Sequence, residues 1–459
     1  MKSQTEETED HWHTALKWIV ALRDRKEVTN MKQVTLLDRI LKPENLNDAY
    51  LQVKRNNGSA GIDGMTIPEA EQYIRENKRA LIKSIRNRTY QPLPVLRKEI
   101  PKPGGGVRLL GIPTVIDRVI QQAISQILTP IFDKEFHDSS FGFRPNRSAH
   151  MALEQGLQYL NEGYDWIVDI DLEKFFDTVN HDRVMNLVSR KVDDGDVISL
   201  VRKYLVSGVM INGEYEKSVV GTPQGGNLSP LLSNVMLNEL DQELDKRGLR
   251  FVRYADDCII FVKSEFSARR VMRSITRYIE ETLGLKVNAT KSKVTKPIDP
   301  EFKYLGFGFY YAYEEEQYKA KPHAISIERF KYKLRQLSRK NWSVSMKHRI
   351  TRLNQTIRGW VNYFKVGSMY NVLRNISAHL RFRLRMCIWH QWKTGKKRVQ
   401  SLIQLRMSPY QAYKNGHSSK GAARIARSWV MCTTVTNKVL ATKGLVSPDE
   451  YYLKQIHVI

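Results

Sequence analysis

Apolar and polar residues between positions 251 and 263 follow a strand pattern interrupted by two acids. The segment FVRYADDCIIFVK contains two runs of β-branched and aromatic residues joined by Asp256 and Asp257. Such runs predict two β-strands, and the short polar link predicts a hairpin. Adjacent carboxylates between apolar strands are unfavourable unless water solvates them or a positive group lies between them and another acid. This segment alone is compatible with either of two interpretations, a solvated turn or a cation-binding site.

A second acidic strand changes that balance. WIVDIDLEKFFDTVNH begins with an apolar strand predicted over 166–172, and a helix is predicted to start near Lys174. Because side chains alternate along a strand, Asp169 and Asp171 share one face. Mg²⁺ prefers hard oxygen ligands, and a pair of ions about 4 Å apart can bind both the attacking and the leaving oxygen of a phosphoryl displacement. Acids from two strands favour such a site.

Helical periodicity dominates the chain after position 321. Apolar residues recur there at spacings of three and four, which predicts three amphipathic helices that bury their apolar faces together. These residues are Phe330, Leu334 and Leu337; Ile350, Leu353, Ile357, Trp360, Val361 and Phe364; and Leu373, Ile376, Leu380, Leu384, Cys387 and Ile388. The same spacing over 115–127 predicts a core helix.

The pattern divides the chain into four parts. Residues 1–33 are polar and charged with a short apolar patch, which indicates a frayed extension or one docking helix. Residues 34–315 mix strand and helix patterns, and 316–400 form the helical segment. Residues 401–459 form a small C-terminal unit punctuated by glycine and proline, which we expect to be a basic nucleic-acid-binding segment.

Charge indicates the kind of partner. The 459 residues include 74 Lys and Arg against 48 Asp and Glu, for a formal net charge of +26, and positions 321–400 alone contain twenty Lys or Arg and one acid, Glu328. Surface helices held by salt bridges interleave both signs, so this segment predicts binding to a polyanion, with nucleic acid as the first choice. The alternative is an ordinary bundle with a solvated charged surface.

Other classes of protein are disfavoured. No apolar run approaches the roughly 18 residues of a spanning helix, and the opening MKSQTEETED lacks the pattern of a secretory signal. The three cysteines, Cys258, Cys387 and Cys432, have no spacing typical of disulfides or zinc. We expect a reduced cytoplasmic protein without a membrane partner.

The tetrapeptide formed by residues 254–257, YADD, resembles the palm hairpin of reverse transcriptases. In motif order over 34–455 the chain resembles the reverse transcriptase/maturase proteins encoded by bacterial group II introns. The resemblance implies an α+β, right-hand-like fold, with fingers and palm built on antiparallel sheet and followed by a helical thumb, or X, domain. It also implies that Asp171, Asp256 and Asp257 are the catalytic acids and hold two Mg²⁺ ions, while Asp169 only flanks them.

The resemblance implies further contacts with the incoming nucleotide. Phe176, five residues after Asp171, would exclude a 2′-hydroxyl, although a core aromatic is the alternative. The remaining candidates are Lys102, Arg108, Leu172, Gln224 and Lys291. Lys102 and Arg108 flank the glycine run of KPGGGVRLLGIPT, where a simple exposed turn is the alternative, and Gln224 lies in GTPQGGNLSPLLSN. Arg144 and Arg147, in FGFRPNRSAHMAL, are equally interpretable as internal ion-pair partners.

Primer and RNA contacts are implied for the region after the palm. In FKYLGFGFY, Tyr304, Leu305 and Gly306 would contact the primer, and a core strand is the alternative. In the basic helices the candidate RNA contacts are Arg329, Lys333, Arg352 and Arg358.

The family binds its intron RNA to assist splicing and copies the inserted intron into DNA during retrohoming. The implied partners are an intron RNA template, a DNA primer or target and dNTPs, in a bacterial cytoplasm at the nucleoid. We expect no endonuclease domain in residues 401–459, because they lack the histidine and cysteine cluster that such a domain uses to bind metal. One alternative is a splicing factor or RNA chaperone that no longer polymerises; another is a domesticated or CRISPR-linked reverse transcriptase.

Overall fold

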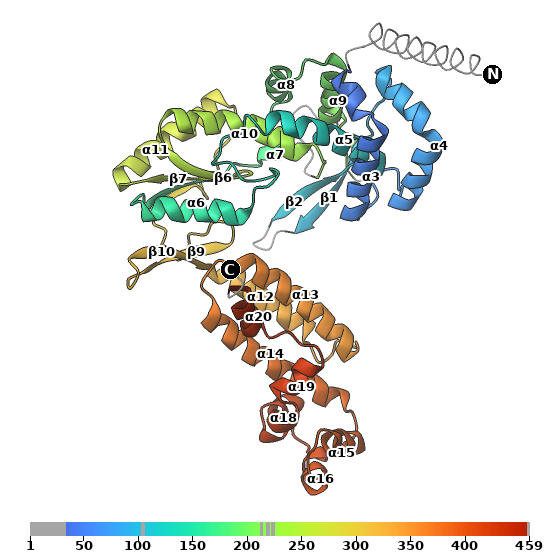
Figure 1. The fold of residues 1–459 in the computed structure, drawn as a ribbon, viewed down its shortest axis with the longest axis vertical. Helices are drawn as coiled ribbons and strands as arrows, with labels where there is room; N and C mark the ends of the chain where they lie inside the picture. The colour runs from blue at the N-terminus through green and yellow to red at the C-terminus, as the bar shows by residue number, and fades with distance from the viewer. Residues whose placement is uncertain (1–33, 102–105, 212–213, 217–220, 222–224, 457–459) are drawn as a thin grey trace, which may run out of the picture.

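The computed structural model describes residues 34–101, 106–211, 214–216, 221 and 225–456. A mixed region of helices and strands comes first along the chain, and every described element from Ala324 onward is a helix. In Figure 1 the helical region extends as an arm away from the mixed region. The predicted α+β class is confirmed.

The palm sheet contains four antiparallel strands in the order β6-β7-β3-β8. Its strands are β3 (Trp166–Ile170), β6 (Arg250–Tyr254), β7 (Asp257–Val262) and β8 (Lys293–Thr295). The hairpin expected around the two acids is the β6–β7 pair, with Tyr254 opposite Asp257. Asp257 therefore opens β7, and the turn consists of Ala255 and Asp256.

Alternate residues of these strands enter two different cores. Val168 and Ile260 face the core shared with α10 (Ser229–Lys246) and α11 (Glu265–Arg277). Ile167 and Phe261 face the core shared with α6 (Ala149–Asn161) and the thumb. Because both faces are covered, the central strands β3 and β7 are mostly apolar, and a charged residue buried in the sheet needs a specific partner.

The fingers sheet is mixed rather than antiparallel, which corrects the expectation for this part. β1 (Val95–Pro101) pairs antiparallel with β2 (Val107–Ile112) but parallel with β4 (Val209–Ile211), which in turn pairs with β5 (Glu214–Glu216). The long excursion through the palm between β1 and β4 supplies the crossover that a parallel pair requires.

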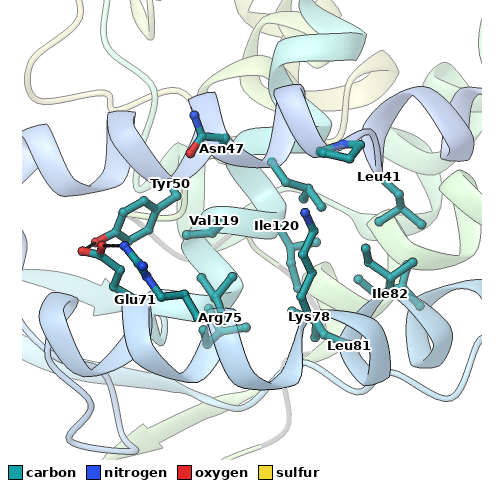
Figure 2. A pocket seen from close by; sticks show the side chains of 15 residues that line it. Leu41, Asn47, Tyr50, Glu71, Arg75, Lys78, Leu81, Ile82, Val119 and Ile120 are labelled. Atoms are coloured by element: carbon teal, nitrogen blue, oxygen red, sulfur yellow. Dashed lines mark hydrogen bonds and ion pairs between the residues drawn. The ribbon is translucent and has the colours of Figure 1, made fainter.

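Helices of the fingers surround an apolar cleft. α3 (Pro43–Asn56) packs along α5 (Val115–Phe132), and α4 (Ile67–Arg86) lies across a cleft of about 300 Å³ whose floor is α5 (Figure 2). Glu71 closes one end by accepting a hydrogen bond from the Tyr50 hydroxyl at 2.6 Å and pairing with Arg75 at 2.8 Å.

The prediction that 115–127 is a core helix is confirmed, since its apolar residues from Val115 to Ile124 are buried.

Shorter helices complete the palm and fingers. They are α2 (Leu36–Ile40), α7 (Phe175–Thr178), α8 (His181–Ser189), α9 (Gly195–Val206) and the π-helix η1 (Tyr278–Thr282). The start of α7 at Phe175 agrees with the helix predicted near Lys174.

A hairpin and three long helices form the thumb. β9 (Phe307–Ala312) and β10 (Gln317–Pro322) lead into α12 (Ala324–Leu337), α13 (Met346–Phe364) and α14 (Tyr370–Gln391). The three predicted helices are confirmed, and their apolar faces meet in one core, where the Phe330 and Trp360 rings stack with centroids 4.3 Å apart.

Six further helices follow the thumb and pack on its core. They are α15 (Gly395–Gln404), α16 (Pro409–Gly416), α17 (Ala422–Ala426), α18 (Trp429–Thr434), α19 (Asn437–Thr442) and α20 (Pro448–Ile456). α17 and α20 lie against α14, and α20 also contacts α13. No helix within the described ranges is long and apolar enough to cross a membrane.

Candidate active site

Asp171 and Asp257 emerge side by side at one edge of the palm sheet. The antiparallel register of β3 and β7 pairs Ile170 with Cys258, so the next residue on each strand toward this edge is an acid. Both acids line a cleft of about 510 Å³ that extends to the thumb helix α12. Residues separated by more than eighty positions are thus brought together by strand pairing.

Asp256 lies beside them in the β6–β7 turn. Ala255 has a φ of 59°, a left-handed conformation that a residue with a Cβ rarely adopts, and Asp256 follows it, half-buried. Asp256 does not itself line the cleft, but its charge is one of the causes that shift the pKa of Asp257. The three predicted acids therefore belong to one local cluster.

The loop that leads into β8 holds the backbone of Asp171 in place. The amide of Asn288 donates to the Asp171 carbonyl at 2.8 Å, and the Asp171 amide donates to the Ser292 hydroxyl at 3.0 Å. From the same loop, Lys291 Nζ lies 3.0 Å from Asp171 Oδ2. Lys291 thus lies beside Asp171, one of the predicted acids, and its expected contact with nucleotide phosphates stays a prediction.

Desolvation, together with the charges of neighbouring acids, raises the pKa of two acids in the cleft. Partial desolvation, followed by the charges of Asp256 and Asp171, raises the pKa of Asp257 to about 6. Desolvation and the charge of Asp257 raise the pKa of Asp169 to about 7. Asp169, expected only to flank the site, lines the cleft with the other acids. The cluster therefore favours a nearby cation.

The nucleotide candidates are only partly visible. Lys102 and Gln224 lie outside the described residues. Arg108 is exposed on β2, Leu172 is buried, and Phe176 is half-buried with its ring 5.2 Å from that of Phe175. Phe176 packs against the core, as the core-aromatic alternative expects, but its ring stays partly exposed. Its role in excluding a 2′-hydroxyl therefore remains a prediction.

Glycines of the GTPQGG segment let it approach the fingers closely. A Cβ on Gly225, whose φ is 123°, would lie 2.4 Å from the carbonyl oxygen of Gly111, and one on Gly226 would lie 2.8 Å from Gln121 Oε1. The next residue, Asn227, donates to Gln122 Oε1 at 3.0 Å. The close approach is to β2 and α5 of the same chain.

The turn before β9 connects the acids to the thumb. Tyr304, Leu305 and Gly306 line the same cleft as Asp171 and Asp257. Leu305 and Gly306 both have positive φ, and their carbonyls accept hydrogen bonds from Tyr363 Oη at 2.9 Å and Ser326 Oγ at 2.8 Å. Tyr304 is buried, which agrees with the core alternative for that residue.

Basic residues of the thumb continue the cleft. Arg329 lines the cleft that contains the acids and also the adjoining groove between α12 and α13, where Lys333 joins it. Arg352 and Arg358 are exposed on α13. Arg329 and Lys333 thus bring positive charge from the cleft into the adjoining groove, whereas Arg352 and Arg358 line neither.

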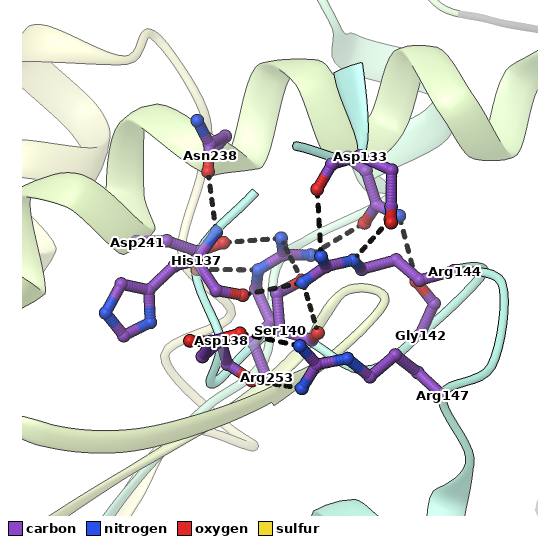
Figure 3. Close-up of polar contacts among 11 residues, drawn as sticks. Asp133, His137, Asp138, Ser140, Gly142, Arg144, Arg147, Asn238, Asp241 and Arg253 are labelled. Atoms are coloured by element: carbon purple, nitrogen blue, oxygen red, sulfur yellow. Dashed lines mark hydrogen bonds and ion pairs between the residues drawn. The ribbon is translucent and has the colours of Figure 1, made fainter. Parts of the chain in front are cut away.

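Three arginines near the palm are used inside the protein (Figure 3). Arg144 bonds Asp133 at 2.7 Å and three main-chain carbonyls, and Arg147 bonds Asp138 at 2.6 Å, so the ion-pair interpretation holds for both. Arg253 was not predicted as functional. The sequence nevertheless contained a sign of its importance, because a charged residue in a buried strand requires a partner inside the protein.

Comparison with known proteins places two families along the chain. A model of "Reverse transcriptase (RNA-dependent DNA polymerase)" matches residues 100–309, and one of "Group II intron, maturase-specific domain" matches residues 327–404. The first runs from the end of β1 through the palm into β9 and leaves out the fingers helices α2 to α4, and the second runs from within α12 to the end of α15. Fold and site thus define a reverse transcriptase joined to a maturase-specific domain.

Similar proteins agree with this assignment. Protein YkfC of Escherichia coli is 32% identical over 311 residues, which cover 59% of this chain and 81% of YkfC. The group II intron-encoded protein LtrA of Lactococcus lactis is 37% identical over 221 residues, or 48% of this chain and 37% of LtrA. Among solved structures, a chain of a partial Cas6-RT-Cas1–Cas2 complex matches at 23% sequence identity with a TM-score of 0.35. The match covers 54% of this chain and 42% of that chain, and a similarity this low does not relate the two folds.

The chain belongs to the group II intron reverse transcriptase/maturase family. Membership in this family implies divalent metal catalysis. No three His, Cys, Asp or Glu side chains within the described part of the chain are already arranged around one metal position. The donor chemistry nevertheless fits, because hard carboxylate oxygens share the cleft, and the charges of Asp256 and Asp171 add to desolvation in raising the pKa of Asp257.

Proposed function

We propose that this reverse transcriptase extends a DNA primer on an RNA template with Asp171, Asp256 and Asp257 as its catalytic acids. We further propose that a group II intron RNA is its natural template, that it binds this RNA to assist splicing, and that it copies the intron into DNA during retrohoming. The observation that carries the proposal is the adjacency of Asp171 and Asp257 at the base of a cleft that continues to the basic helix α12.

The acids have distinct supports in this arrangement. Asp171 is held by main-chain bonds to a loop, and Asp257 is held by its place at the start of β7. Rigid elements suit catalysis because small misplacement of reacting atoms lowers rate steeply. A pair of Mg²⁺ ions, when bound, supplies charge stabilisation for the attacking and leaving oxygens. Asp171 and Asp257 would hold them, with Asp256 completing the set.

Cations and an aromatic residue would select and orient the nucleotide. Lys291, next to Asp171, is placed to meet phosphate or to donate a proton to departing pyrophosphate. Phe176 keeps the proposed role of excluding a 2′-hydroxyl. The roles of Arg108 and Leu172, and those of Lys102 and Gln224 outside the described residues, remain predictions from the family.

Primer extension tests the polymerase proposal. The wild-type protein, Asp256→Asn and a control, Asp182→Asn, are compared on poly(rA) with oligo(dT), Mg²⁺ and dTTP. Asp182 suits the control because it is an exposed acid of the palm paired only with Arg202. We expect extension by wild type and control, none by Asp256→Asn, and RNA binding by all three. Undiminished extension by Asp256→Asn would remove that residue from the active site.

The intron-related roles need a separate test. Co-purification from the native host followed by RNA sequencing should recover one intron RNA, and adding the protein to that RNA should accelerate its splicing at low Mg²⁺. Recovery of RNA without intron sequence would contradict the maturase proposal. If the wild-type protein accelerates splicing but extends no primer, the chain is an RNA-binding splicing factor instead.

A further inference from the structure

Arg253 is a fully buried charged residue in the strand that leads to the catalytic turn. It lies on β6 two residues before Ala255, between the apolar Val252 and the aromatic Tyr254, and its side chain has no exposed surface. A buried charge is unfavourable unless it is paired and hydrogen-bonded. Its partners therefore show what the guanidinium holds together.

Two of the guanidinium nitrogens bind an acid on the helix behind the sheet. Nε and Nη2 lie 2.7 and 2.6 Å from the two carboxylate oxygens of Asp241, which is also fully buried on α10. This forked pair neutralises the charge. A buried ion pair is in itself weak evidence for a stabilising role, because apolar residues of similar volume often replace such pairs without loss. The remaining contacts are more informative.

The remaining donor capacity is directed at the turn and its surroundings. Nη1 donates to the carbonyl of Ala255 at 2.8 Å and to Asn234 Oδ1 at 3.0 Å, and Nη2 also donates to Ser140 Oγ at 2.7 Å. Ala255 is the left-handed residue immediately before Asp256. A strained conformation of this kind persists only where surrounding contacts hold it, and the bond from Arg253 is such a contact.

A loop holds the same turn from its other side. A Cβ on Gly142 would lie 2.2 Å from the amide nitrogen of Ala255, and the Gly142 carbonyl accepts a hydrogen bond from Asn234 Nδ2 at 2.8 Å. The Phe141 amide donates to the Arg253 carbonyl at 2.9 Å. Asn234 thus joins the loop to the guanidinium, and the turn is enclosed by the loop, α10 and Arg253.

We propose that Arg253 is a positioning residue that fixes the Ala255–Asp256 turn and thereby sets the place of Asp256 and Asp257 relative to Asp171. Arg253 touches neither substrate nor metal in this scheme and acts through the Ala255 carbonyl. The inference rests on the proposed roles of the three acids. It goes beyond them by assigning to Arg253, Asn234 and Gly142 the geometry on which those roles depend.

The test substitutes Arg253→Lys and uses Arg144→Lys as the matched control. Lysine keeps a positive charge beside Asp241 but has no planar fork with which to reach Ala255 at the same time. Arg144 is also buried, pairs with Asp133 and bonds main-chain carbonyls of the loop that contains Gly142, but none of its bonds reaches Ala255 or Asp256. Both variants therefore lose a comparable buried network.

Three measurements separate positioning from general stability. Amide hydrogen exchange should accelerate at the β6–β7 hairpin in Arg253→Lys and not in Arg144→Lys. Mn²⁺ binding to the enzyme–primer–template complex, followed by electron paramagnetic resonance, should weaken roughly 10-fold or more, as for other groups that orient metal ligands. Single-turnover extension, well below the melting temperature, should fall by roughly 10²-fold, with primer–template affinity unchanged.

A second variant covers a failure of Arg253→Lys to fold. Arg253→Met combined with Asp241→Leu removes both buried charges together and leaves the Ala255 carbonyl without its donor, and we expect the same three effects. Hairpin exchange and Mn²⁺ affinity that match Arg144→Lys in a folded variant would overturn the positioning role. If the wild type extends no primer, the polymerase proposal fails, and the exchange and Mn²⁺ comparisons still decide the role of Arg253.

Discussion

Lys291 Nζ lies 3.0 Å from a carboxylate oxygen of Asp171, although 120 residues separate the two along the chain. The ammonium is largely exposed, and exposed ion pairs add about 0 to 1 kcal/mol to stability. The pair is therefore more informative about chemistry than about folding. It brings a lysine ammonium, for which we propose phosphate binding or proton donation, directly beside one of the proposed catalytic acids.

The first prediction concerns that lysine. Lys291→Gln should lower the single-nucleotide incorporation rate by roughly 10²-fold, the lower end for loss of a general acid, while the melting temperature barely changes. Lys291→Arg should retain part of the rate because it keeps the charge. Rapid-quench measurements at saturating dNTP decide it, with the exposed Lys286→Gln as control. Equal rates for Lys291→Gln and Lys286→Gln would exclude a role for Lys291 in the chemical step.

The second prediction uses the raised pKa of Asp257. Because folding raises this pKa from 3.8 to about 6, the folded state favours the protonated carboxyl. The resulting stability is fully present below pH 3.8 and is lost as the pH rises through 6. Asp257→Asn removes the charge, so in metal-free buffer its melting temperature should exceed that of the wild type above pH 6, with the difference shrinking toward pH 4.

The control for that prediction is Mg²⁺. Adding the ion should raise the melting temperature of the wild type more than that of Asp257→Asn, because only the wild type keeps the full set of carboxylates. The variant should also be inactive in primer extension. A variant less stable than the wild type at pH 8 without metal would contradict a raised pKa of Asp257 in the folded protein.

The third prediction concerns the contact between Gly142 and the Ala255–Asp256 turn. A methyl group at this position would lie 2.2 Å from the Ala255 amide nitrogen, so Gly142→Ala must displace the turn. We expect extension to fall by roughly 10²-fold with RNA affinity preserved. Gly359→Ala is the matched control, since its Cβ would meet nothing within 4 Å on α13. There, alanine should stabilise the helix by about 0.5 to 1 kcal/mol. Normal extension by Gly142→Ala would mean that the turn tolerates displacement.

The fourth prediction concerns the basic thumb. Each phosphate contact contributes about 0.7 to 0.9 to the slope of log affinity against log salt. Replacing Lys333 and Arg358 together by glutamine should therefore reduce that slope by roughly 1.4 to 1.8 for RNA. Filter binding over a range of KCl concentrations measures it, with the exposed palm residue Lys246→Gln as control. An unchanged slope would place the RNA elsewhere on the molecule.

Local patterns in the sequence sufficed for much of the fold. The hairpin around Asp256, the strand before Asp171 and the three thumb helices were predictable because their apolar periodicity reflects burial on one or both faces. The mixed fingers sheet was not predictable in this way. Its parallel pairing of Val95 with Val209 joins segments with more than a hundred residues between them, and no local spacing encodes such a contact.

For the candidate site, too, some features were predictable from local sequence patterns and others were not. The sequence by itself determined which acids stand at the ends of apolar strands, because a carboxylate there requires solvent or a cation. Only the tertiary structure decided that Asp169 lines the cleft together with Asp171 and Asp257, and that Lys291 reaches Asp171. It also decided that Arg144 and Arg253 form ion pairs with acids inside the protein. The physical reason is that strand register and helix packing set distances between remote side chains, whereas composition and periodicity report only how each segment meets its own surroundings.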